Sequence, residues 1–151
     1  MQHVLFFAWI LAAAAALAML EVQIEGPGGW AAGLPTWRSD HRLARLVLGG
    51  RTLTGYHLWV HVTVLLLVHL VYPLGAAPFS WRMEARILAF LALFWVLEDF
   101  LWFVFNPAFG LRRFRREHVP WHEQWWGPLP REYWIFTPLA VFVYAWSVGG
   151  S

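Results

Sequence analysis

Carboxylates and imidazoles recur in this chain at spacings that place them in pairs. Glu21 and Glu25 lie four residues apart at the end of an apolar run, and His57 and His61 lie four apart in a second run. Side chains four residues apart share one face of a helix. Two imidazoles at this spacing commonly bind a metal ion, and carboxylates complete or bridge such sites. The two pairs therefore predict metal-binding chemistry.

Two further groups carry the same chemistry. Glu98 and Asp99 are adjacent within the apolar run "FWVLEDFLWF", and His118 and His122 flank a proline in "HVPWH". An ionised acid in an apolar span costs several kcal/mol unless it is paired, protonated or bound to a metal. Neighbouring helical residues point about 100° apart, so we expect Glu98 to face the site. Asp99 would then hold a histidine or an arginine beside it.

Together these residues predict one site with nitrogen and oxygen donors. Such donors suit iron, manganese or zinc. The donor set is larger than one tetrahedral zinc ion needs, and it could fill two metal ions. The predicted cofactor is therefore Fe, mononuclear or dinuclear, and Zn is the other candidate. Glu25 and Asp99 are the candidate catalytic acids, and one acid would shuttle protons. The predicted metal ligands are Glu21, Glu25, His57, His61, Glu98, His118 and His122.

Apolar segments must position this site. The chain has 151 residues, of which 60% are hydrophobic and only 13% charged, more apolar surface than a soluble domain of this size can cover. Hydropathy predicts four spans, at 4–24, 56–74, 83–105 and 134–148. No Lys or Arg precedes the first span, which favours a retained helix over a signal peptide. The expected fold is a single all-α integral membrane domain, 1–151, of four transmembrane helices with two long interfacial connections.

Arginine counts give the expected orientation. Nine of the eleven arginines lie in the two long connections, 25–55 and 106–133. Basic residues favour the cytoplasmic side, so we predict a multi-pass protein of the cell membrane, in a bacterial inner membrane, with both termini outside. This topology brings the four acid and histidine groups to the cytoplasmic face. Their convergence there disfavours a transporter, which needs polar residues through the whole depth.

Composition also narrows the function. The absence of cysteine excludes disulfides, thiolate zinc sites, cysteine-ligated iron–sulfur clusters and c-type haem. The arginines lie beside apolar segments, so the expected partners are membrane lipids and not nucleic acid. Twelve tryptophans provide candidate walls for a lipid-like substrate. The sequence therefore predicts a small membrane metalloprotein, a metal-dependent oxidoreductase of the oxygenase or desaturase type.

Other interpretations stay open. The chain fits a non-catalytic subunit of a bioenergetic or photosynthetic complex, in which His61 or His69 binds haem or a chlorin and aromatic side chains pack against other membrane subunits. The acids and histidines also fit plain interfacial roles. Glu21 and Glu25 would then face water, and Glu98 and Asp99 would form an ion pair with Arg112 or Arg113.

Overall fold

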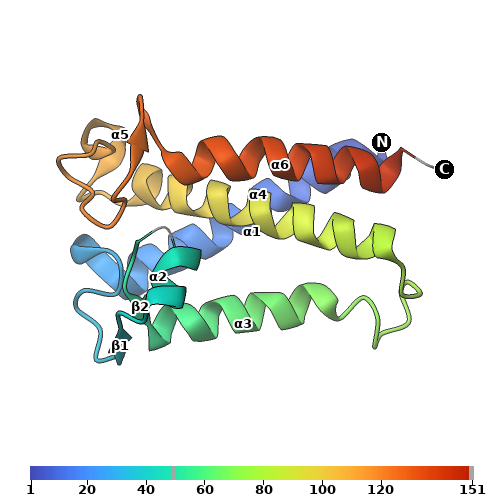
Figure 1. Cartoon of the computed structure of the whole chain (residues 1–151), viewed down its shortest axis with the longest axis horizontal. Helices are drawn as coiled ribbons and strands as arrows, with labels where there is room; N and C mark the ends of the chain where they lie inside the picture. Colours follow the sequence, from blue (N-terminus) through green and yellow to red (C-terminus); the bar gives the residue numbers. More distant parts are fainter. Residues whose placement is uncertain (49, 150–151) are drawn as a thin grey trace.

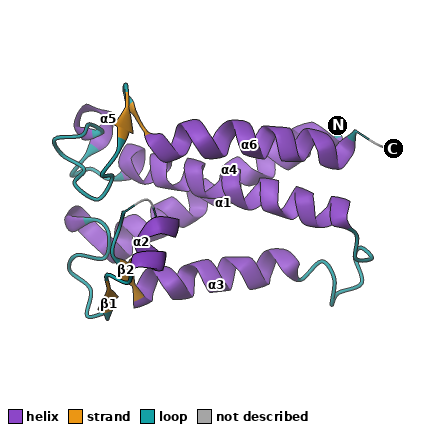
Figure 2. Ribbon diagram, viewed as in Figure 1, coloured by secondary structure: helices purple, strands orange, loops and turns teal. Residues whose placement is uncertain are grey.

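The computed structural model describes residues 1–48 and 50–149, with the backbone alone for Leu46 and Val47. Its long helices are α1 (Gln2–Glu25), α3 (Gly55–His69), α4 (Trp81–Phe105) and α6 (Arg131–Val148), which run side by side (Figure 1). The connections hold short elements (Figure 2). These are η1 (Gly26–Gly28), α2 (Arg42–Val47), α5 (Gly110–Arg113) and two antiparallel strand pairs, β1 (Arg38–Ser39) with β2 (Leu53–Thr54) and β3 (Trp125–Trp126) with β4 (Leu129–Pro130).

Helix α4 is the centre of the packing. It packs mainly against α1 and α6, and much less extensively against α3. Ala14 and Ala18 of α1 are fully buried, because small side chains let two helix backbones approach closely. Leu93 and Phe94 of α4 fill the adjoining core together with Ala140 of α6. The structure is mostly helical, as the sequence predicts, with two short strand pairs in the connections.

Two helices have the length and apolar composition needed to cross a membrane. They are α1 with its 3-10 extension, Gln2–Gly28, and α4, Trp81–Phe105. Helix α3 is apolar but has 15 residues, fewer than the roughly 17–25 needed to span a bilayer. It ends at His69, before the predicted boundary at 74, because a proline at 73 disfavours helical geometry in the residue that precedes it.

Helix α6 has 18 residues and carries Pro138 inside it. Within the described residues, α1 and α4 alone have both the length and the apolar composition of a membrane-crossing helix, and four crossings stay a prediction.

The elements that carry the predicted site lie at one end of the helices. Both long connections gather there, whereas the turn between α3 and α4 lies at the opposite end with both chain termini (Figure 1). The end of α1, the start of α3 and the end of α4 therefore meet the connections in one layer.

Candidate functional site

A cavity of about 90 Å³ lies where α1, α3 and α4 meet the first connection. Glu21, Glu25, Glu98 and His57 have exposed fractions of only 5–8%, so the alternative in which the first two acids face water does not apply. Arg51 and several aromatic rings complete the walls. The lining includes six of the residues predicted from the sequence: Glu21, Glu25, His57, His61, Glu98 and Asp99.

A tight turn after α1 builds one wall. Gly29, Trp30 and Ala31 have φ angles of 59°, 46° and 52°, a left-handed conformation that is rare for residues with a side chain. A Cβ atom on Gly29 would lie 2.8 Å from the Trp121 ring, so only glycine fits there. The turn directs the amide of Ala31 back to α1, where it donates to Glu25 Oε1 at 2.6 Å. Such strain is typical of a functional site.

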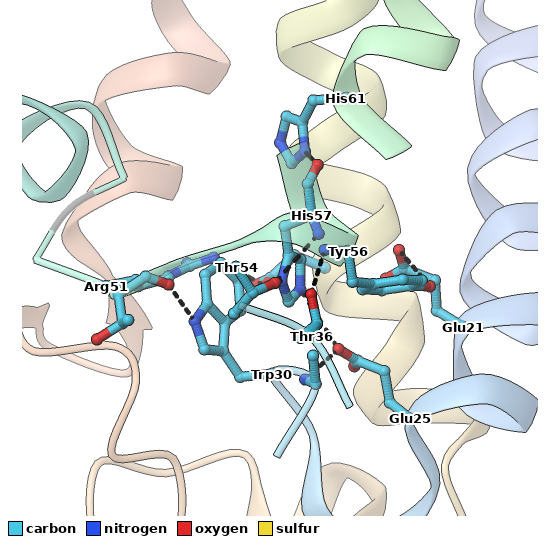
Figure 3. Close-up of polar contacts among 12 residues, drawn as sticks. Glu21, Glu25, Trp30, Thr36, Arg51, Thr54, Tyr56, His57 and His61 are labelled. Carbon is cyan, nitrogen blue, oxygen red and sulfur yellow. Dashed lines mark hydrogen bonds and ion pairs between the residues drawn. The ribbon is translucent and has the colours of Figure 1, made fainter. Parts of the chain in front are cut away.

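His57 is held from three sides (Figure 3). The Thr54 hydroxyl accepts a hydrogen bond from the His57 amide at 3.2 Å and lies 2.7 Å from the ring Nδ1. The Nε2 atom lies 3.3 Å from Glu25 Oε1. The Trp30 ring stacks on the imidazole at a centroid distance of 3.9 Å. Threonine can donate to Nδ1, which leaves Nε2–H to donate to the carboxylate.

The acids of α1 and α4 form a carboxyl pair. Glu21 accepts a hydrogen bond from the Tyr56 hydroxyl at 3.2 Å, and the carboxyl groups of Glu21 and Glu98 are direct neighbours. Two unit charges 4 Å apart repel by about 4 kcal/mol at an effective dielectric constant of about 20. The pair therefore needs a shared proton or a cation between its oxygens.

Two buried polar atoms at the cavity lack a partner. In the described part of the chain, neither Glu98 Oε1 nor the indole nitrogen of Trp102 makes a hydrogen bond. Both residues line the cavity. An unpaired buried acceptor costs about 1–3 kcal/mol, which a ligand in the cavity would recover.

Asp99 belongs to a separate network beside the cavity. Its Oδ2 atom lies 2.9 Å from His122 Nε2 and accepts a hydrogen bond from the Tyr133 hydroxyl at 2.5 Å. Arg51 Nη1 lies 3.6 Å from Oδ1. Burial and the carboxylate raise the pKa of the Tyr133 phenol, so it stays a proton donor. Asp99 thus contacts both a histidine and an arginine, and these contacts favour a supporting role over proton transfer.

The remaining histidines occupy different positions. His61 lines the cavity, but its Nδ1 donates to the carbonyl of His57 at 2.7 Å and its ring stacks on Trp95. His122 is buried with Arg51 Nη2 2.7 Å from its Nδ1. His118 is exposed and lies outside the cavity lining. Of the seven predicted ligands, one belongs to the Asp99 network (His122), one is exposed (His118), and the others line the cavity: Glu21, Glu25, His57, His61 and Glu98.

The donors are paired with one another in this conformation. Among residues 1–48 and 50–149, no three acids or histidines lie close enough to hold a metal ion. Glu25 and His57 satisfy each other, and Arg51 occupies the Asp99–His122 pair. A metal would therefore have to displace the Glu25–His57 contact.

Several residues at the site had no signal strong enough to single them out. Arg51 counts in the sequence only as one basic residue of a connection, yet it lies with its guanidinium carbon 4.7 Å from the Trp30 ring centre. Thr54 does have a local signature, since a threonine before an apolar helix favours the N-cap position. Tyr56 and Tyr133 have none, because their contacts join residues 34 or more positions apart.

Comparison with known proteins gives no relative. No protein-family model matches the chain, and no curated protein or solved structure is significantly similar to it. The chemistry of the site must therefore be argued from its donors and its volume. A cavity of about 90 Å³ has room for several waters.

Proposed function

We propose that this is a membrane protein that binds one divalent transition-metal ion, Fe²⁺ or Zn²⁺, in the carboxylate-rich cavity. The observation that carries the proposal is the buried carboxyl of Glu98, which lies beside Glu21 with an oxygen that makes no hydrogen bond to any described residue. Carboxylate and imidazole donors without sulfur suit these ions. The cavity has room for an ion with a few waters.

Charge balance supports a cation. Four acids line the cavity, and Arg51 is its only arginine among the described residues. Arg51 pairs with Asp99, which leaves Glu21, Glu25 and Glu98 with the imidazoles of His57 and His61 as the other basic groups in the described lining. Burying three carboxylates without compensation would cost several kcal/mol each. A divalent ion would offset two of these charges.

The expected ligands follow from these contacts. Glu21 of α1 and Glu98 of α4 would supply oxygen ligands. Glu25 and His57 would become ligands when the contact between them opens. Thr54 supports this exchange because its hydroxyl can donate to Nδ1 or accept from it. It can therefore stabilise the His57 tautomer that presents a free Nε2 lone pair to a metal.

The reaction class that we propose is oxidation of a lipid-like molecule by dioxygen, which would take up the electrons removed from the substrate, and it requires iron and not zinc at the site. An iron site with oxygen and nitrogen donors supplies redox chemistry, and the cavity is walled by Trp30, Trp95, Trp102, Trp121 and Phe103. The cavity is too small for such a substrate, so the substrate would have to approach the ion through this aromatic wall. Metal binding is the part of the proposal that can be tested without a known substrate.

Metal content of the purified protein provides the test. Glu98→Gln keeps the shape of the side chain and removes its charge, whereas His118→Ala changes a histidine outside the cavity. We expect about one equivalent of bound iron or zinc in the wild type and the His118 variant, and at least tenfold less in the Glu98 variant. Equal metal content in all three would refute the proposal.

A second measurement separates the competing explanation, in which the carboxyl pair shares a proton. Infrared difference spectra report the carbonyl band of a protonated carboxyl group. If that band is lost in Glu98→Gln and unchanged by added Zn²⁺ in the wild type, the pair holds a proton and metal binding is refuted. Loss of the band on addition of Zn²⁺ supports the proposal.

A further inference from the structure

A second hollow lies away from the acid and histidine cavity. It is a groove of about 540 Å³ between three helices, and its lining is almost entirely apolar. The groove exists because α3 packs only loosely against α4. Its walls include Ala13 and Leu17 of α1, Val64 and Val68 of α3, and Phe90 and Phe94 of α4.

One arginine lines this apolar groove. Arg86 of α4 is half-buried, and its Nε atom has no hydrogen-bond partner among the described residues. The acid nearest to it in the sequence, Glu84, lies 3.4 Å from His69 Nε2 and is not part of the groove lining. A charged side chain within an apolar span normally pairs with an anion or reaches the membrane surface. Arg86 thus offers an unused anion site at the wall of an apolar groove.

The length of the groove suits an extended hydrocarbon chain. The lining on α4 runs from Met83 to Phe94, about 17 Å at a rise of 1.5 Å per residue. Arg86 is the one charged residue of this lining among the described residues. An amphiphile with one extended chain and an anionic headgroup therefore matches both the apolar walls and the single charge.

We propose that the groove between α1, α3 and α4 binds a single-chain anionic amphiphile, a long-chain fatty acid, with its carboxylate on Arg86. The guanidinium presents planar donors that match a carboxylate in a two-point contact. The hydrocarbon chain lies along the α4 face that ends at Phe94. This site is independent of metal binding, because it shares no lining residue with the acid and histidine cavity.

The test uses palmitate and hexadecanol, which share a chain and differ in charge, with binding to the purified protein measured by native mass spectrometry. The wild type should bind palmitate at least tenfold more tightly than hexadecanol. Arg86→Gln should remove that preference. Arg82→Gln is the matched control, since Arg82 is exposed and lies outside the groove lining. It should behave as the wild type does.

A second pair of variants tests the groove itself. Ala13→Phe places a ring in the groove, and Ala12→Phe places one on an exposed position of the same helix. The first should abolish binding of both amphiphiles, and the second should leave it unchanged. Equal binding of palmitate and hexadecanol, or palmitate binding that survives both Arg86→Gln and Ala13→Phe, would overturn the proposal. A change of oligomeric state in Ala13→Phe without loss of palmitate would also overturn it, because a second copy would then occupy the groove.

Discussion

Replacing Glu98 by methionine should stabilise the metal-free protein. The carboxyl is 5% exposed, one of its oxygens has no partner in the described chain, and it lies beside Glu21. Removing an unpaired buried acceptor recovers about 1–3 kcal/mol, and relief of repulsion adds to this wherever both acids are ionised. Methionine is flexible and of similar length, so it should fill the space without a large cavity. Loss of the contact with Glu21 costs about 1 kcal/mol.

The net expectation is a free energy of unfolding that rises by up to about 2 kcal/mol, within the range of about 1–4 kcal/mol by which apolar replacement of buried charged groups commonly stabilises. The assay is thermal unfolding in detergent with a chelator present, followed by tryptophan fluorescence. Each kcal/mol should raise Tm by about 2–4 °C for a chain of this length. Glu117→Met, at an exposed position, should change stability by less than about 0.5 kcal/mol.

Added metal should make the wild type more stable to unfolding than the Glu98→Met protein. A ligand at 100 times its Kd stabilises the folded state by about 2.7 kcal/mol, and only the wild type should gain this from Zn²⁺ or Fe²⁺. A Glu98→Met protein that is less stable than the wild type by more than 1 kcal/mol in chelator would refute the argument. It would mean that the carboxyl is fully satisfied where it lies.

Three further predictions concern the walls of the cavity. Gly29→Ala should lower the free energy of unfolding by about 2–4 kcal/mol, because the new methyl group would meet the Trp121 ring at a positive φ; chemical denaturation measures this. Thr54→Ala should lower the free energy of unfolding by about 1 kcal/mol, because the N-cap is lost. It should also weaken metal affinity about 10–100-fold, because the His57 ring is no longer held. Thr54→Ser should keep both properties close to those of the wild type. Asp99→Asn should destabilise by about 2 kcal/mol, because it leaves a largely buried arginine unpaired; thermal scans that match the wild type would contradict this.

Local patterns in the sequence determined which elements form. Apolar runs separated by glycine, proline and arginine gave the long helices, because burial of helical apolar faces and the 3.6-residue repeat act over a few turns. The pairing of Glu21 with Glu25 and of His57 with His61 is also local. The alternation of four apolar runs predicted that both long connections share an end, and the arrangement in Figure 1 agrees. The number of membrane crossings was not determined in this way, since α3 ends five residues before the predicted boundary at 74.

Only the tertiary structure decided which side chains meet. Helical spacing puts Glu21 and Glu25 on one face, but their partners, Tyr56 and His57, come from another helix. The left-handed turn at Trp30 sets that approach, and no periodic pattern encodes it.

The histidines show most clearly that spacing in the sequence does not determine which side chains meet. His118 and His122 lie four residues apart in the sequence, yet one is exposed and the other is buried against Arg51 and Asp99. Residue types and spacing thus predicted which acid and histidine groups are available and how far along the helices they lie. Packing between distant segments decided which groups were already paired, because burial forces each polar atom to find a partner wherever the fold brings one within reach.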